Sequence, residues 1–276
     1  MNFHVTKLRN EFDRPYYLIS TSDDKILFLR AWKPLTTPKK EAILVFHGIT
    51  AYSGPYEVLA EPLSQKGYSV FGLDLRGHGL SDGIRGDYPS KERLIKDLCE
   101  TIAFVKQKAP HVILLGHSLG VLSSLIATNH CLEDINGLIL LSAARTFRPG
   151  VYPKISILTK LKILIYSILF PSKPVITYYR EGMMGSDDPL FNFKYTFRFM
   201  KIFRAEDLKI PERLNFPIFV GLGEHDELFT IEAGRELYDE IPSEKKEFFI
   251  IPGAKHADFP EGSLDRLVKW LHEKFE

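Results

Sequence analysis

Short, almost wholly apolar segments recur along the chain, and segments with helical periodicity separate them. Segments that are apolar on both faces are typical of buried parallel strands. We expect such strands at residues 42–46, 68–73, 112–115, 138–141, 218–222 and 248–251. Helices are predicted at residues 57–66, 121–129, 232–239 and 264–275, and in a segment that Ser90 caps and Pro110 ends. Because strands and helices alternate, the predicted fold class is α/β, with a mostly parallel central sheet and helices on both faces.

Two regions depart from this alternation. Residues 16–21 and 25–32 predict the two strands of a hairpin near the N-terminus, with its turn at Ser22, Asp23 and Asp24. Residues 143 to about 213 lie between two predicted strands and are far too many for a simple crossover. We therefore expect one α/β domain over residues 1–276, with a cap inserted at about residues 145–210. The cap should lie over the edge where the parallel strands end, which is where open α/β sheets bind ligands.

The composition is that of an ordinary globular protein. Of 276 residues, 45% are hydrophobic and 26% are charged. Its 36 basic and 35 acidic residues give a net charge of +1, so the basic excess of a nucleic-acid-binding protein is missing and no nucleic-acid partner is expected. Cys99 and Cys131 form no CxxC or zinc-like spacing, and we expect them to be reduced and buried.

No segment of the sequence resembles a membrane span or a secretory signal. The first 15 residues contain no apolar core of a signal peptide. No run reaches the roughly 18 apolar residues that a transmembrane helix needs. The expected location is the cytoplasm.

Residues 116–120 form a G-x-S-x-G motif around Ser118. A predicted strand precedes the motif and a predicted helix follows it, which is the strand-turn-helix setting of a nucleophile elbow. Such a turn strains the serine backbone and points its hydroxyl into a cleft. Ser118 is therefore the predicted nucleophile, and the alternative is a glycine-rich turn with a buried serine.

A serine nucleophile needs a base and an acid. Among nine histidines, His256 directly follows the last predicted strand, at the sheet edge where Ser118 is expected. The acid should lie between nucleophile and base in the chain order of this fold. Glu224 and Asp226 both follow the strand at residues 218–222. Asp226 is preferred because it lies deeper in the loop, and Glu224 is the alternative.

Acyl transfer also needs donors for the oxyanion. The backbone N–H of Leu119, which follows the nucleophile, is one candidate. The loop after the strand at residues 42–46 should supply the other, and Ile49 is the best candidate there. No group of His, Cys and acidic residues has metal-ligand spacing. We therefore expect neither a metal nor a cofactor.

The motifs resemble those of the monoglyceride lipase and lysophospholipase branch of the α/β-hydrolases. They are the His47-Gly48 pair, the elbow GHSLG, the segment DLRGHGLS at residues 74–81 and the DPL at residues 188–190. The resemblance implies the α/β-hydrolase fold, a Ser118–His256–Asp226 triad and oxyanion donors at Ile49 and Leu119. It further implies hydrolysis of carboxylic esters, typically acylglycerols with one chain.

The resemblance is weakest at residues 155–173, so the residues that contact glycerol cannot be carried over. The main hypothesis is a monoacylglycerol lipase or esterase that acts through an acyl-enzyme. A lysophospholipase or a general carboxylesterase is the alternative within enzymes. A non-catalytic binding protein on a hydrolase scaffold is the alternative outside them.

Residues 154–170 read KISILTKLKILIYSILF and predict a helix that is apolar around most of its circumference. Either this helix is buried, or it is a lid that lies against lipid with its lysines at the head groups. The expected partners are a small lipid or ester substrate and, through the lid, a membrane or micelle surface. The aromatic residues that follow either line an acyl tunnel or form core: Phe191, Phe193, Tyr195, Phe197, Phe199 and Phe203.

Overall fold

The computed structural model describes residues 3–151, 156–179, 183–204 and 209–275. Its centre is an eight-stranded sheet in which β1 pairs with β2 and β2 with β4 in antiparallel fashion, while all other neighbours are parallel. The order across the sheet is β1 (Tyr16–Ser20), β2 (Ile26–Trp32), β4 (Ser69–Leu73), β3 (Glu41–Phe46), β5 (His111–His117), β6 (Gly137–Leu141), β9 (Ile218–Gly223) and β10 (Lys246–Ile251).

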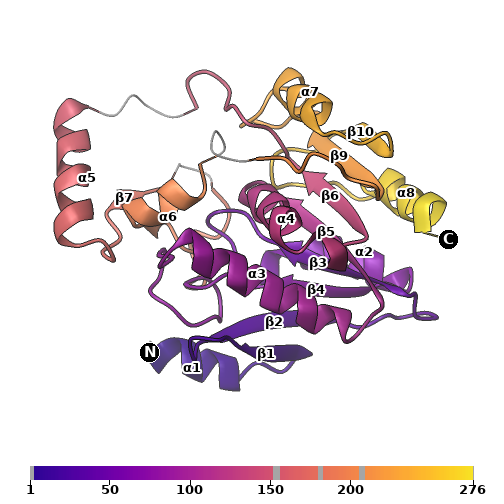
Figure 1. Cartoon of the computed structure of the whole chain (residues 1–276), viewed down its shortest axis with the longest axis horizontal. Coiled ribbons are helices and arrows are strands. Elements are labelled where there is room, and N and C mark those ends of the chain that lie inside the picture. The colour runs from indigo at the N-terminus through magenta and orange to yellow at the C-terminus, as the bar shows by residue number, and fades with distance from the viewer. Residues whose placement is uncertain (1–2, 152–155, 180–182, 205–208, 276) are drawn as a thin grey trace.

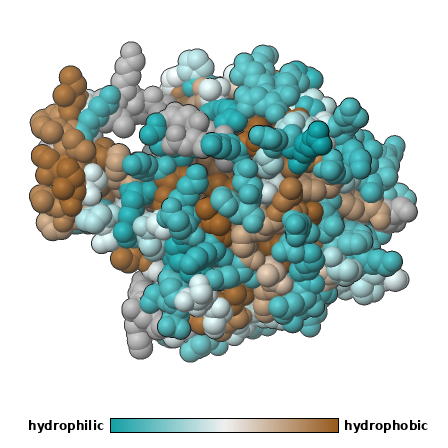
Figure 2. All heavy atoms as spheres, in the orientation of Figure 1, coloured by the Kyte–Doolittle hydropathy of each residue, from teal (hydrophilic) through white to brown (hydrophobic). Residues whose placement is uncertain are grey.

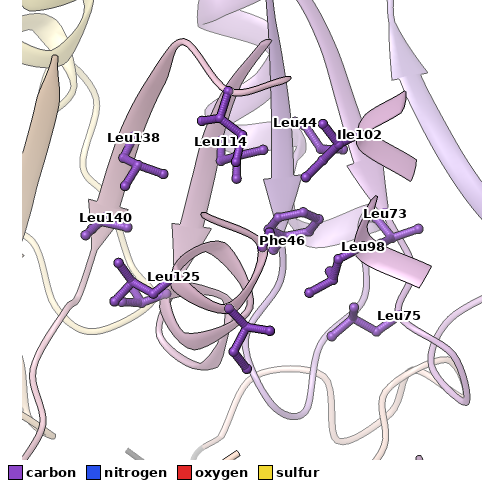
Figure 3. Packing of buried hydrophobic residues seen from close by; sticks show 14 of the residues in the cluster. Leu44, Phe46, Leu73, Leu75, Leu98, Ile102, Leu114, Leu125, Leu138 and Leu140 are labelled. Atoms are coloured by element: carbon purple, nitrogen blue, oxygen red, sulfur yellow. The ribbon is translucent and has the colours of Figure 1, made fainter. Parts of the chain in front are cut away.

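Helices cover both faces of this sheet (Figure 1). One face carries α3 (Lys91–Lys106), α4 (Leu119–His130) and α7 (Ile231–Glu240), and the other carries α2 (Glu57–Gln65) and α8 (Asp265–Phe275). Successive residues of β3 serve the two faces in turn, because side chains alternate along a strand. Leu44 and Phe46 pack with Leu98 of α3 and Leu125 of α4 (Figure 3), whereas Val45 belongs to the cluster under α2 and α8.

This arrangement confirms the predicted fold class. The hairpin, the six predicted parallel strands and the five helices lie where the sequence places them, within a few residues at each end, although the edge strand β10 is mostly half-buried. Ser90 caps α3 as expected, because its hydroxyl accepts the Arg93 N–H at 3.1 Å. The N-terminal helix α1 (Phe3–Asn10) and the 3₁₀ turns η1 (Gly54–Tyr56) and η2 (Leu132–Asp134) were not predicted.

The long connection between β6 and β9 holds the remaining elements, which are α5 (Ile157–Leu169), β7 (Ile176–Thr177), β8 (Lys194–Tyr195) and α6 (Phe197–Ile202). In Figure 1, α5 stands at the edge of the molecule, away from the sheet.

The apolar side chains of α5 are largely exposed, and Figure 2 shows them as a hydrophobic projection. They include Ile157, Leu158, Leu161, Leu164, Ile165, Ile168 and Leu169, with Phe170 just beyond the helix. The alternative that this segment is a buried helix is therefore wrong. Lys154, the first residue of the predicted helix, lies outside the described residues. Among the residues described, no helix is long and apolar enough to cross a membrane.

The cysteines correct an expectation. Cys99 and Cys131 form a disulfide with their Cα atoms 5.9 Å apart, and both are half-buried rather than buried and reduced. Cys99 lies on α3, and Cys131 directly follows α4. Because these helices pack on the same face of the sheet, two cysteines 32 residues apart in sequence meet. Sequence spacing alone does not reveal such a meeting.

Candidate active site

Ser118 occupies the sharp turn between β5 and α4. Its backbone has φ 55° and ψ −117°, a conformation that a residue with a side chain adopts only under strain. The turn is tight because its glycines admit close backbone approaches. A Cβ on Gly120 would lie 1.9 Å from the Phe46 carbonyl oxygen, and a Cβ on Gly116 would lie 2.4 Å from that of Gly120. These contacts explain why glycine stands on both sides of the serine.

Three residues from distant parts of the chain form a hydrogen-bonded row. His256 Nε2 lies 2.9 Å from Ser118 Oγ, and its Nδ1 lies 3.0 Å from Asp226 Oδ2. The other carboxylate oxygen of Asp226 accepts the N–H groups of Leu228 and Phe229, at 2.8 and 2.9 Å. The predicted nucleophile, base and acid are thus brought together.

Asp226 is buried, yet it is held as a carboxylate. Burial alone would raise its pKa, but the hydrogen bond and charge of His256 and the two backbone donors outweigh burial and lower the pKa. The alternative acid, Glu224, is exposed and accepts the Gly253 N–H at 2.9 Å. In the structure Asp226, and not Glu224, therefore lies within hydrogen-bond distance of His256 Nδ1.

The backbone of His256 is also held, by groups that the sequence did not single out. Its carbonyl oxygen accepts hydrogen bonds from His117 Nε2 at 2.7 Å and from Ser142 Oγ at 3.0 Å, and its N–H donates to Glu227 at 3.0 Å. Because His117 Nε2 carries a proton, its Nδ1 accepts the Tyr56 hydroxyl, at 2.7 Å. Burial and the nearby charge of His256 lower the pKa of His117 to about 3, so this ring is neutral at pH 7. His117 lies inside the G-x-S-x-G motif, but no local pattern shows that its ring holds the backbone of His256.

The loop after β3 lies against the nucleophile. A Cβ on Gly48 would be 3.5 Å from the Cβ of Ser118. The Gly48 carbonyl oxygen is held by His47 Nδ1 at 2.8 Å and by the Ala51 N–H at 3.2 Å. The Gly48 C=O and the Ile49 N–H belong to the same trans peptide and point in opposite directions. The two bonds to the Gly48 carbonyl therefore turn the Ile49 N–H away from the side on which His47 Nδ1 and the Ala51 N–H lie.

Leu119, the second candidate donor, is the first residue of α4. The first N–H groups of a helix have no partner within it, and the helix dipole favours negative charge at this end. Neither the Ile49 N–H nor the Leu119 N–H donates to another group in the part of the chain that the structure describes. Both are thus available to a developing oxyanion.

Comparison with known proteins agrees with this geometry. Residues 37–262 match the family described as serine aminopeptidase, S33. The chain belongs to this family. It is 28% identical to the monoglyceride lipase of Rattus norvegicus over 92% of this chain and 89% of that protein. It is 24% identical to the monoacylglycerol lipase of Mycolicibacterium smegmatis, over 87% of this chain and 90% of that protein. It also matches the uncharacterized protein YnbC of Escherichia coli at 25% identity, but it spans only 43% of that protein.

Solved structures share the fold of this S33 family member. A monoacylglycerol lipase from Paleococcus ferrophilus superposes with a TM-score of 0.69 at 24% identity, covering 90% of this chain and 99% of that one. A soluble variant of the monoglyceride lipase from Saccharomyces cerevisiae, bound to a substrate analogue, gives a TM-score of 0.74 at 19% identity, covering 96% of each chain. The resemblance found in the sequence is confirmed, and the protein is a serine hydrolase with the α/β-hydrolase fold.

In this S33 hydrolase a cavity of about 470 Å³ opens onto Ser118 and His256. Much of its wall is apolar. These lining residues come from α2, from the connection between β6 and β9, and from the segments after β9 and β10: Val58, Leu59, Tyr178, Met184, Phe191, Leu228 and Phe259. Glu227, Lys255 and Asp258 add charge to the lining. Within the described ranges, no three His, Cys, Asp or Glu residues are grouped as metal ligands would be.

Proposed function

We propose that the protein is a monoacylglycerol lipase in which Ser118 is the nucleophile, His256 the general base and Asp226 the acid that orients it. One observation carries this assignment: the row of hydrogen bonds from Asp226 through His256 to Ser118, which ends at a largely apolar cavity. The monoglyceride lipases among the relatives support the substrate class.

The proposed reaction has two halves. Ser118 Oγ attacks the ester carbonyl carbon and passes its proton to His256 Nε2, while Asp226 stabilises the imidazolium. The tetrahedral intermediate collapses, the ester C–O bond breaks, and His256 protonates the departing glycerol oxygen. Water then attacks the acyl-enzyme with His256 again as base, and Ser118 regains its proton as the fatty acid leaves.

The oxyanion of both intermediates is assigned to the N–H groups of Ile49 and Leu119. Backbone donors that are already oriented stabilise this charge without a metal ion, and removal of one such donor typically costs 10²–10³ in rate. The position of Leu119 at the start of α4 adds the favourable end of the helix dipole.

Two measurements test the assignment. A fluorophosphonate probe should label the wild-type protein and leave Ser118→Ala unlabelled, because the probe needs an activated serine. A rate panel should then rank a long-chain monoacylglycerol above a triacylglycerol, a lysophospholipid and p-nitrophenyl butyrate in kcat/KM. Absence of labelling would favour a binding protein on a hydrolase scaffold. A lysophospholipid or the soluble ester ranking first would refute the substrate class.

The segment at residues 145–210 is proposed to form a cap whose α5 contacts the surface of a membrane or micelle. The support is the exposure of α5, where Ile157 is 86% and Leu161 is 50% exposed, and Lys160 is exposed on the same helix. Apolar side chains can enter the acyl boundary while a lysine extends to the head groups. Such contact would bring the enzyme to an aggregated substrate as a peripheral protein. The cytoplasmic location stays a prediction.

A double variant, Ile157→Ser with Leu161→Ser, tests the cap. Burial of an aliphatic side chain contributes roughly 2 kcal/mol, so binding to phosphatidylcholine vesicles should weaken by at least about tenfold. Hydrolysis of long-chain monoacylglycerol should slow, and that of p-nitrophenyl butyrate should not. The matched control is Leu35→Ser with Leu132→Ser, which removes exposed leucines elsewhere. Equal slowing of both substrates, or equal vesicle binding by both double variants, would contradict the proposal.

A further inference from the structure

The connection between β6 and β9 reaches back to the loop that carries the proposed oxyanion donor. Tyr195 of β8 is fully buried, and its hydroxyl donates to the carbonyl oxygen of Ile49. The same hydroxyl lies 2.7 Å from the Asn192 carbonyl oxygen. The ring is fixed by packing, with its centroid 4.7 Å from that of Phe199 and 5.8 Å from that of His78.

A second contact holds the next peptide of the same loop. The Asn192 N–H donates to the Thr50 carbonyl oxygen at 2.9 Å. One residue beyond Tyr195, the Thr196 N–H donates to the Gly86 carbonyl oxygen at 2.9 Å, which ties the segment to the loop between β4 and α3. Residues 192–196 therefore hold two successive carbonyl groups of the oxyanion loop, at Ile49 and Thr50.

We propose that Tyr195 is a positioning residue for the Ile49 N–H, an inference that rests on the proposed role of that N–H as an oxyanion donor. The peptide before Ile49 is oriented by the bonds to the Gly48 carbonyl. The peptide after it is oriented by the Tyr195 hydroxyl. With both neighbouring planes held, the two dihedral angles of Ile49 are restrained and its N–H keeps one direction.

The chemistry of the hydroxyl suits this role. Burial raises the pKa of Tyr195 well above its usual value, so the group keeps its proton and remains a donor at working pH. Loss of the hydroxyl leaves the peptide between Ile49 and Thr50 freer to rotate. An oxyanion donor must lie about 2.7–3.1 Å from the oxygen in the transition state, so a small rotation weakens transition-state stabilisation more than substrate binding.

The test is Tyr195→Phe, which removes one oxygen and keeps the packed ring. With p-nitrophenyl butyrate, kcat should fall about tenfold while KM stays within about twofold. A trifluoromethyl ketone, which forms a tetrahedral oxyanion on the serine, should bind more weakly by about the same factor. A non-reactive ether analogue of the substrate should bind unchanged.

Tyr88→Phe is the matched control. Tyr88 is also fully buried, and its hydroxyl donates to Asp97 at 2.6 Å. This contact lies on the buried face of α3 and outside the lining of the active-site cavity. Tyr88→Phe should lower the melting temperature, as Tyr195→Phe should, without the loss of kcat or of ketone affinity. Rates are compared at a temperature at which both variants are fully folded.

The outcomes distinguish failure of the positioning role of Tyr195 from failure of the proposed function. Unchanged kcat in Tyr195→Phe, or a loss matched by Tyr88→Phe, would overturn the role of Tyr195 and leave the proposed function intact. Failure of the wild type to react with the fluorophosphonate probe would overturn the proposed function itself.

Discussion

Replacement of Asp226 by Asn tests the proposed mechanism most sharply, because the structure dictates how the amide must lie. One oxygen of Asp226 accepts the N–H groups of Leu228 and Phe229 at 2.8 and 2.9 Å. These donors need an acceptor, so the amide oxygen must take this place. The amide NH₂ then takes the other position, 3.0 Å from His256 Nδ1.

The consequence is a change of tautomer. Facing a donor, His256 Nδ1 must present its lone pair, so the ring proton moves to Nε2. That nitrogen lies 2.9 Å from Ser118 Oγ and can no longer accept the serine proton. A wrong tautomer in a comparable triad lowers kcat by about 10⁴. This factor corresponds to about 5.5 kcal/mol in activation free energy, and the nearly isosteric change should leave the fold intact.

The assay is kcat with p-nitrophenyl butyrate, alongside the rate of fluorophosphonate labelling and the melting temperature. Glu224→Gln is the control, because Glu224 is exposed, accepts the Gly253 N–H and does not touch His256. It should lower kcat by less than about threefold. If Glu224→Gln cost more than Asp226→Asn, or if Asp226→Asn retained a tenth of the wild-type kcat, the reasoning would be refuted.

Three further predictions concern the triad, the disulfide and the pKa of His117. Ser118→Ala and His256→Ala should each lower kcat by about 10⁵–10⁶, and the double variant should lose little more, which steady-state rates can check; additive losses would show that the two do not act as a unit. Reduction of the disulfide, or Cys131→Ser, should lower the free energy of unfolding by about 4 kcal/mol for a closed loop of 32 residues, and an unchanged urea midpoint would exclude this contribution. His117 has a pKa of about 3 when folded and 6.5 as its reference value, so the unfolded state binds more protons between these values. Stability should therefore fall as the pH drops from 6.5 towards 3, by up to about 1.4 kcal/mol per unit from this group, and a urea midpoint that rises on acidification would contradict the assignment.

Much of the fold is encoded locally and was predictable from the sequence. An apolar strand such as β3 and an amphipathic helix such as α3 are marked by the spacing of their own side chains, so neither needs knowledge of its neighbours. The same holds for the turn at Ser118, because the flanking glycines mark the close backbone approaches that a nucleophile elbow requires. The order of Ser118, Asp226 and His256 along the chain then followed from the fold.

What only the tertiary structure decided concerns pairs of groups far apart in sequence. Three acidic residues follow β9, and the path of the loop brings Asp226, not Glu224, to the ring of His256. The disulfide depends on how α3 and α4 pack, and the exposure of α5 depends on where the connection after β6 leads. The hydrogen bond from the Tyr195 hydroxyl to the Ile49 carbonyl oxygen joins residues that are 146 positions apart in the sequence. The periodicity of a segment predicts which of its faces is buried and which is exposed to water. It does not predict which distant group will complete a hydrogen bond, because that partner is determined by the tertiary packing.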